Sequence, residues 1–97
     1  MNIGSDKSNG KLNISVEGRL DTVTAPELES FLGENCECVC ELIIDCEKLT
    51  YVSSAGLRVL LAAHKKMKGA MKLKNVCELV MEVLEITGFA DILTIES

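Results

Sequence analysis

The sequence of 97 residues has only three aromatic side chains and no tryptophan, although 47% of its residues are hydrophobic. Its core must therefore be aliphatic, built from Leu, Ile, Val, Ala, Cys and Met. An excess of basic residues is also missing, because the formal net charge is −5. Binding to nucleic acid depends on clustered Lys and Arg that face phosphates, so this balance argues against a nucleic-acid partner. We expect the partner to be a protein.

Long hydrophobic runs are absent as well. No apolar run approaches the roughly 18 residues that a membrane span requires. The first six residues, Met1-Asn2-Ile3-Gly4-Ser5-Asp6, lack the charged-then-apolar layout of a signal peptide. We therefore expect no membrane contact and a cytoplasmic location, and the length indicates one domain over residues 1–97.

Five cysteines do not pair evenly, so they do not form a simple disulfide framework. Three of them alternate at Cys36, Cys38 and Cys40. In an extended chain their sulfurs would point to one side and continue the face of Leu42 and Ile44. A metal or redox site is one interpretation of this run.

Zinc sites usually combine closely spaced pairs of ligands. The other candidates here, Cys46, Cys77 and His64, have no paired spacing. We therefore favour buried thiols with one partly exposed, and expect no metal. The expected oligomeric state is a monomer, with oxidative dimerisation through Cys as the alternative.

Alternating apolar residues predict strands near 11–17, 71–74 and 92–95. The turn signal Asn9-Gly10 suggests a short edge strand near 2–5 that pairs with the first of these. Residues 41–45 are apolar on both alternations, which is typical of a central strand covered on both faces.

Helical spacing predicts three helices between these strands. The first begins with Thr24 and Glu27 as a capping box, has Pro26 in its first turn, and ends at Gly33. The second begins near residue 54 and stops at Gly69. The third follows Asn75 as its cap, and a left-handed Gly88 ends it. Its expected apolar face consists of Val76, Leu79, Val80, Val83 and Leu84.

The stretch 50–61 connects the strand at 41–45 to the second helix through small residues. With Ser53 as the N-cap, its hydroxyl can accept the backbone N–H of Ala55 or Gly56. The N–H groups of a first helical turn lack intrahelical partners, and the helix dipole adds partial positive charge there. A phosphate on Ser54 would therefore be favoured.

Three segments that together span nearly the whole chain resemble one known family. The first is Tyr51-Val52-Ser53-Ser54-Ala55-Gly56-Leu57, with Asp45 and Leu49 before it. The second is Gly18-Arg19-Leu20-Asp21-Thr22-Val23-Thr24-Ala25, and the third is Leu84-Glu85-Ile86-Thr87-Gly88-Phe89. They are similar to the Asp-Ser-Ser-Gly-Leu signature, the Gly-x-Leu-Asp-x-x-Thr-Ala segment and the closing helix end of STAS-domain anti-sigma factor antagonists.

This resemblance implies an α/β fold, a single STAS-like domain with a mixed four- to five-stranded sheet and about three helices. The extra C-terminal helix usual in the family would be lacking, because the chain reaches only Ser97 after its last apolar run. It also implies a partner switch. The unphosphorylated protein would bind an anti-sigma factor that is a serine kinase and so release a sigma factor. Phosphorylation would end this binding, and a phosphatase would restore it.

Ser54 falls on the family's phosphorylated serine, whereas Ser53 replaces the preceding Asp and is the alternative acceptor. ATP would belong to the kinase, so no cofactor is expected for this chain. The residues expected to meet the partner are Asp21, Thr22, Ser53, Ser54, Ala55, Gly56, Leu57 and Arg58.

Two other functions differ in kind from a switch. Catalysis is disfavoured because a nucleophilic Ser54 needs a base, and the only histidine, His64, is nearly three helical turns further on. Gly-x-Ser-x-Gly and the Gly-rich phosphate loops are also missing. The remaining alternative is a STAS adaptor without a switch, in a signalling or lipid-transport complex.

Overall fold

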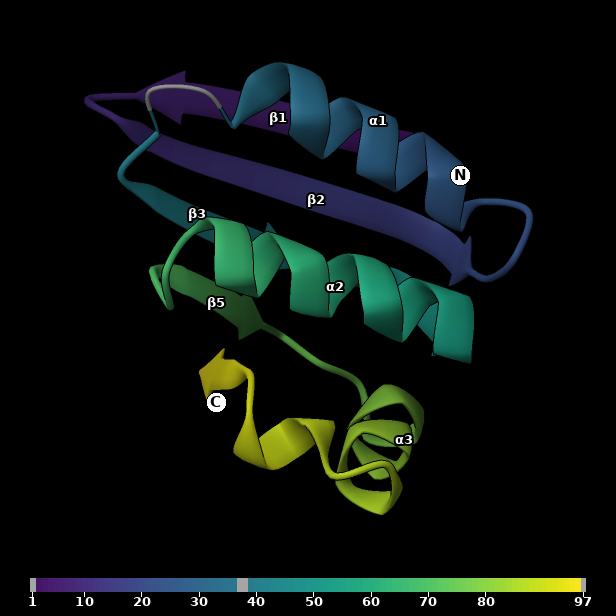
Figure 1. Ribbon diagram of the computed structural model, residues 1–97. Helices are drawn as coiled ribbons and strands as arrows, with labels where there is room; N and C mark the ends of the chain where they lie inside the picture. Colours follow the sequence, from purple (N-terminus) through teal and green to yellow (C-terminus); the bar gives the residue numbers. More distant parts are fainter. Residues whose placement is uncertain (1, 37–38, 97) are drawn as a thin grey trace.

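A computed structural model describes residues 2–36 and 39–96 of the chain (Figure 1). Within them lie six strands, three α-helices and one short 3₁₀ helix, η1. Their order is β1 (Asn2–Ser8), β2 (Lys11–Leu20), α1 (Ala25–Asn35), β3 (Glu41–Asp45), β4 (Leu49–Val52), α2 (Ser54–Lys66), β5 (Met71–Lys74), α3 (Glu78–Ile86), η1 (Phe89–Asp91) and β6 (Thr94–Glu96).

The strands form a mixed sheet in the order β1-β2-β3-β5-β6. The first pair is an antiparallel hairpin, turned by Asn9 and Gly10 at positive φ, and the other neighbours are parallel. The predicted α/β fold with a mixed sheet and an opening hairpin is confirmed.

One strand was not foreseen. β4 has four residues and pairs only with the end of β2, past a register shift between Gly18 and Arg19. So short a segment, directly followed by a helix, has too few alternating positions to be distinguished from a loop by its pattern.

Helices α1 and α2 lie side by side on one face of the sheet (Figure 1). Aliphatic side chains from both layers fill the space between them, as the composition predicts. The largest fully buried side chains of the protein are Leu12, Ile14, Leu20, Leu28, Leu42, Ile44, Leu49, Met71, Leu73, Leu84, Val16 and Val52.

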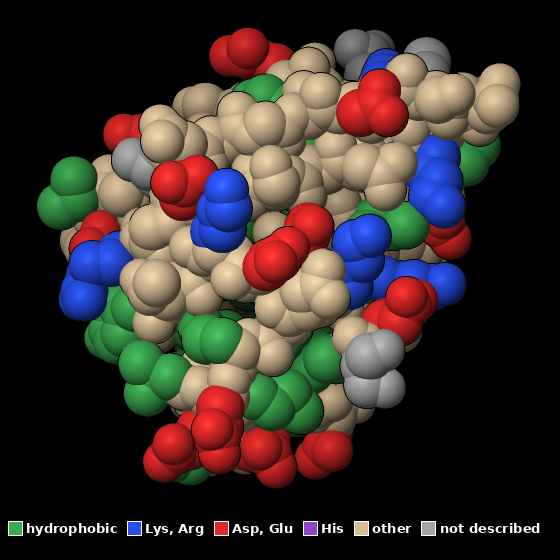
Figure 2. All heavy atoms as spheres, turned by 180° about the vertical axis from the view of Figure 1, so that it is seen from behind, with side chains coloured by type: hydrophobic (Ala, Val, Ile, Leu, Met, Phe, Trp, Pro, Cys, Tyr) green, Lys and Arg blue, Asp and Glu red, His purple; other side chains and the backbone are tan. Residues whose placement is uncertain are grey.

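The opposite face of the sheet is seen in Figure 2, where charged and other polar side chains occupy much of the surface. The prediction that the strand at 41–45 is covered on both faces is wrong. Leu42 and Ile44 are buried under the helices, whereas Ile43 on the other face is only half-buried. The extra apolar residue reflects its central place in the sheet, not a second helical layer.

Two helix ends differ from the prediction. Helix α1 continues past Gly33 to Asn35, because Gly33 adopts ordinary helical backbone and lies on the exposed face. Pro26 is in the first turn as expected. Thr24, however, makes no side-chain cap, because its hydroxyl is engaged in the loop that precedes the helix.

Helix α3 begins at Glu78 with Cys77 as its N-cap, so the prediction of an Asn75 cap is wrong. Asn75 instead has φ +56° and its side-chain amide donates to Asp45 Oδ1 (3.1 Å). The helix ends before Gly88 at φ +82°, as predicted. Because η1 follows, the last strand starts at Thr94 rather than at Ile92.

The two described cysteines of the run 36–40 differ in burial. Cys36 is buried at the C-terminal end of α1, whereas Cys40 is exposed. Cys38 lies outside the described residues. Cys46 is buried, and this burial, together with the nearby Asp45, raises the pKa of its thiol to about 12. The expectation of buried thiols with one partly exposed thus holds in part, because Cys36 and Cys46 are buried, whereas Cys77 is half-buried and Cys40 is exposed.

Among residues 2–36 and 39–96, no helix is long and apolar enough to cross a membrane. The same residues contain no cluster of three or more His, Cys, Asp or Glu side chains suited to a metal ion.

Candidate functional site

The start of α2 has the geometry that the sequence predicts. β4 ends at Val52, and Ser53 follows as the N-cap with extended backbone at φ −100° and ψ 177°. Its hydroxyl accepts the backbone N–H of Gly56, at an N···O distance of 3.4 Å. The N–H of Ser53 itself donates to the carbonyl of Leu20 at the end of β2 (2.9 Å). Ser53 is therefore held in place from both sides.

Ser54 is the first residue of α2, and its side chain is exposed. The first turn has no acidic side chain, so nothing negative on the helix neutralises the partial positive charge of its N-terminus. The backbone N–H groups of Ser54 and Ala55 have no partner within the helix. An anionic group attached to Ser54 would meet favourable electrostatics.

Gly56 lies on the inner side of this turn. A Cβ atom at this position would be 2.7 Å from Leu20 Cγ, 2.9 Å from the Leu20 carbonyl oxygen and 2.9 Å from Val52 Cγ2. Real Cβ atoms do not approach so closely, so only glycine lets the helix start rest directly on β2 and β4. The next residue, Leu57, is 3% exposed and belongs to the core.

A compact loop after β2 lies at the same end of the molecule as the start of α2 (Figure 1). Asp21 Oδ1 accepts the backbone N–H of Val23 (3.0 Å) and of Thr24 (3.1 Å). The Thr24 hydroxyl accepts the N–H of Asp21 (2.8 Å) and donates to the Arg19 carbonyl (2.6 Å). We call residues 21–24 the Asp21 loop.

The pKa of the Asp21 carboxyl is lowered, chiefly by the hydrogen bond from the Thr24 backbone. Loss of solvent opposes this lowering, but hydrogen bonds from the Val23 backbone and the Thr24 hydroxyl and the charge of Arg19 add to it, so the net shift is downward. The loop therefore holds a fixed negative charge at neutral pH.

Arg19 and Tyr51 complete this end of the sheet, and sequence reasoning missed both. Arg19 Nε is 3.7 Å from Asp21 Oδ2, and its guanidinium lies 4.3 Å from the centroid of the Tyr51 ring. The two residues are register partners on β2 and β4. The signal that could have found them is the pairing of β4 with β2.

The predicted site residues differ in how far their side chains are exposed to solvent. The side chains of Thr22, Ser54 and Arg58 are exposed, those of Asp21, Ser53 and Ala55 are half-buried, and Gly56 and Leu57 are buried. Leu20 connects the groups, because it precedes Asp21 and contacts the backbone of both Ser53 and, closely, Gly56. The structure brings the Asp21 loop and the α2 start together, but turns Gly56 and Leu57 inward.

His64 is ten residues after Ser54 on the same helix, which corresponds to about 15 Å along the helix axis. This separation removes it as a base for the Ser54 hydroxyl.

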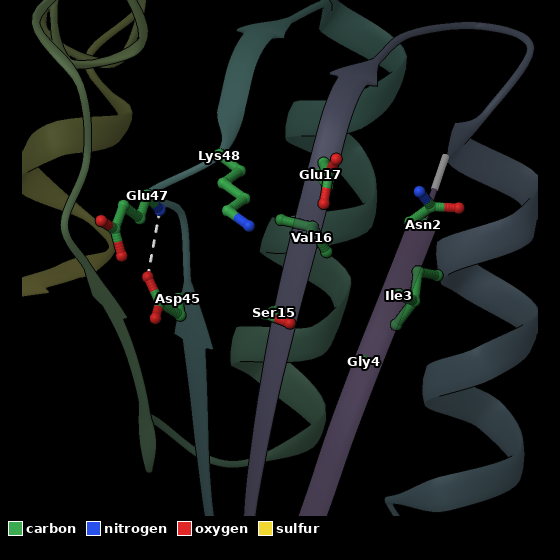
Figure 3. A pocket seen from close by; sticks show the side chains of 9 residues that line it. All are labelled: Asn2, Ile3, Gly4, Ser15, Val16, Glu17, Asp45, Glu47 and Lys48. Atoms are coloured by element: carbon green, nitrogen blue, oxygen red, sulfur yellow. Dashed lines mark hydrogen bonds between the residues drawn. The ribbon is translucent and has the colours of Figure 1, made fainter.

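Two hollows lie near this end of the sheet. One of about 580 Å³ is lined by Glu17, Gly18, Arg19 and the Asp21 loop. The other, of about 460 Å³, lies between β1, β2 and the turn after β3 (Figure 3). Neither contains Ser53 or Ser54 in its lining.

In the second hollow Asp45 Oδ1 accepts the N–H of Glu47 (3.0 Å), as the dashed line in Figure 3 marks. Burial alone would raise the pKa of Asp45. Hydrogen bonds from Asn75 and from the Glu47 backbone, with the charge of Lys74, prevail and lower it. These contacts join the ends of β3 and β5 and indicate a structural role.

Comparison with known proteins identifies relatives over the whole length. The model of the STAS domain family matches residues 2–97. The anti-sigma-B factor antagonist of Bacillus subtilis is 30% identical over 102 aligned residues, which cover 100% of this chain and 94% of that protein. BtrV of Bordetella bronchiseptica, provisionally assigned as an anti-sigma factor antagonist, is 34% identical over 96 residues, covering 95% and 83%.

Solved structures agree on the fold. A Thermotoga maritima protein with the same provisional assignment superimposes with a TM-score of 0.87 at 15% identity, covering 98% of this chain and 86% of its own. The anti-sigma factor antagonist SpoIIAA in its unphosphorylated form gives a TM-score of 0.75 at 14% identity, with coverage of 99% and 88%. Its phosphorylated form from Bacillus gives 0.73 at 15% identity, covering 99% and 92%. The chain therefore belongs to the STAS domain family, among the anti-sigma factor antagonists.

Proposed function

We propose that this chain is a phosphorylation-controlled partner switch formed by one STAS domain over residues 1–97. In its unphosphorylated form it binds an anti-sigma factor that is also a serine kinase, and a sigma factor is released. Phosphorylation of Ser54 by that kinase ends the binding, and a phosphatase restores it. The observation that carries the proposal is the exposed Ser54 hydroxyl on the first residue of α2, beside the Asp21 loop.

A phosphate on Ser54 would change the surface more than the fold. It adds about −1.5 to −2 charges at neutral pH. The free N–H groups and the dipole of α2 stabilise this charge, and no acidic side chain in the first turn opposes it. The phosphorylated protein therefore stays folded and presents a dianion where it previously presented a small neutral patch.

This change is sufficient to release a partner. A protein that docks closely over Ser54 and Ala55 excludes water from their surface. Burying an unpaired phosphate there would cost several kcal/mol, and a cost of this size weakens binding by more than about a hundredfold. The switch needs no movement of the backbone.

The proposed contact surface consists of exposed and half-buried residues on the α2 start and the Asp21 loop. Its members are Asp21, Thr22, Ser53, Ser54, Ala55 and Arg58. Gly56 and Leu57 support this surface from inside the protein. Gly56 allows the first turn of α2 to lie close to β2 and β4, and the Leu57 side chain is buried in the core. Asp21 contributes a fixed charge that a basic residue of the partner can pair with.

Ser54 is a better acceptor than Ser53. The Ser53 hydroxyl is half-buried and accepts the Gly56 N–H, so its phosphorylation would remove the cap of α2. The Ser54 hydroxyl is exposed and can reach a kinase active site without disturbing the helix. SpoIIAA, which shares the fold, has been solved in both phosphorylated and unphosphorylated forms.

The test is intact-mass analysis with peptide mapping after incubation with Mg-ATP and each anti-sigma kinase of the same genome. We expect one added phosphate on wild type and on Ser53→Ala, and none on Ser54→Ala. Ser54→Glu should bind the kinase at least about tenfold more weakly than wild type, because it buries a charge. The matched control, Ser8→Glu, places the same charge at the hairpin end of β1 and should bind normally.

Phosphate on the Ser54→Ala protein would transfer the acceptor role to Ser53. No phosphate with any kinase, alongside stable binding to another protein, would replace the switch by the adaptor function.

A further inference from the structure

Helix α3 exposes a row of large apolar side chains that the fold leaves uncovered. Leu79 is 54% exposed and Ile86 77% exposed. They lie two turns apart, with the half-buried Val83 between them at helical spacing, so the three form one stripe. Just past η1, which packs on α3, Ile92 is also 50% exposed. We call Leu79, Val83 and Ile86 the α3 ridge.

The ridge is separate from the face that attaches α3 to the protein. Val80 and Leu84 are 2% and 0% exposed and form that inner face. The start of the helix is tied to β4 by the Cys77 thiol, which donates to the Leu49 carbonyl (3.4 Å). Because this attachment uses other residues, the ridge is available for a second contact.

Charge along the chain is distributed very unevenly around this ridge. Residues 1–74 contain ten acidic and ten basic side chains, whereas residues 75–97 contain five acidic and no basic ones. The whole formal net charge of −5 thus resides in the segment that carries the ridge.

Three of these acidic residues, Glu78, Glu82 and Glu85, are exposed on α3 at helical spacing. At 100° per residue they form a row beside the stripe, on the side away from Val80 and Leu84. In the lower part of Figure 2, where α3 and the C-terminal segment lie, hydrophobic side chains are bordered by a group of acidic ones.

We propose that the α3 ridge docks a partner protein through an amphipathic helix that is apolar on one face and lined with Lys or Arg. The apolar stripe can pack against the apolar face of a second helix, and the acidic row selects basic flanks. A second copy of this chain is disfavoured, because paired α3 helices would place acidic rows close together. An anionic membrane surface is disfavoured for the same reason.

This inference does not depend on phosphorylation of Ser54, since it uses different residues and a different element. It therefore survives or fails independently of the proposed switch.

The experiment uses the ¹⁵N-labelled full chain and two synthetic 18-residue amphipathic peptides with the same Leu positions. One peptide has Lys on its polar flanks and the other has Glu. We expect the Lys peptide to shift backbone amide resonances of α3 and η1 and to bind more weakly as salt is added. The Glu peptide should leave these resonances unchanged.

Variants then test the ridge itself. The double variant Leu79→Ser with Ile86→Ser should bind the Lys peptide about tenfold or more weakly than wild type, because two apolar contacts are lost. Val23→Ser is the matched control, since Val23 is 79% exposed but lies in the Asp21 loop, and it should bind normally. Both side chains of the double variant are mainly exposed, so its thermal midpoint should stay close to that of wild type.

Reversing the charge of the acidic row tests the electrostatic part of the proposal separately. Glu78→Lys with Glu82→Lys should exchange the preference, so that the Glu peptide binds and the Lys peptide does not. Amide shifts confined to other elements, equal binding of both peptides, or a dimer of the free protein formed through α3 would each overturn the proposal.

Discussion

Helices α2 and α3 are both short amphipathic helices joined to strands of one sheet, yet they use their surfaces differently. Helix α2 buries five residues, among them Leu57 and Leu60, and keeps small neutral residues at its start. Helix α3 buries only Val80 and Leu84, and its outer surface carries apolar and acidic side chains. Helix α2 is thus packed closely against the sheet, whereas α3 is attached through a narrow strip of its surface.

The difference follows from position. Helix α2 lies on one face of the sheet beside α1, so it has protein neighbours both beneath it and at its side. Helix α3 contacts chiefly β4 and η1, so only one stripe of its surface is covered. The proposed phosphorylation site thus lies on the more closely packed helix, and the apolar ridge lies on the less covered one.

The largest expected effect tests whether the inner and outer faces of α3 are truly distinct. Leu84→Ala should lower the free energy of unfolding by about 3 kcal/mol, because it removes a fully buried side chain and leaves a cavity. The matched change Leu79→Ala should cost less than about 1 kcal/mol, because that side chain is more than half exposed. Urea denaturation of both variants measures the difference. Equal losses would mean that the ridge is part of the core.

A similar pair of changes tests the tight base of α2. Gly56→Ala should destabilise the protein by about 2 kcal/mol, because the new methyl group overlaps Leu20 and Val52. Gly33→Ala in α1 is the control, because nothing lies within 4 Å of its Cβ position. There, the gain in helix propensity should raise stability by about 0.5–1 kcal/mol. If Gly56→Ala is also stabilising in urea unfolding, the α2 start is not held closely against β2.

The sequence predicted the parts of the fold that local patterns determine. Alternation identified β2 and β5, the Asn9-Gly10 turn signal identified the hairpin, and an unbroken apolar run identified β3. The Ser53 cap was predicted with the N–H of Ala55 or Gly56 as donor, and the structure has Gly56. Resemblance to the family predicts that the Asp21 loop and the α2 start meet a partner together; the structure places both at the same end of the molecule, and the shared contact stays a prediction. The anti-sigma factor antagonists, to which this chain belongs, are regulators rather than enzymes.

Other features depend on which elements become neighbours, and no local pattern carries that information. β4 exists because its backbone finds the end of β2, and this pairing also brings Arg19 to Tyr51. Gly56 is buried because Leu20 lies beneath it. Leu79 has the right spacing for a core residue, but the sheet provides nothing for it to pack against.

The smallest expected effect concerns the Asp21 loop, which borders the α2 start and has no counterpart at α3. The pKa of Asp21 is lowered in the folded protein, chiefly by the Thr24 backbone N–H, relative to an unfolded value of about 3.9. A carboxyl group whose pKa is lower in the folded protein stabilises the fold at pH values above its unfolded pKa. This contribution is lost as the pH falls through its folded pKa.

Asp21→Asn keeps a hydrogen-bond acceptor but removes the charge. It should therefore melt slightly below wild type at pH 7, and the two midpoints should converge once the pH is below the lowered pKa of Asp21. Thermal unfolding followed by circular dichroism measures both midpoints, and a gap that stays constant from pH 7 to pH 2 would show that the loop depends on the shape of Asp21 and not on its charge.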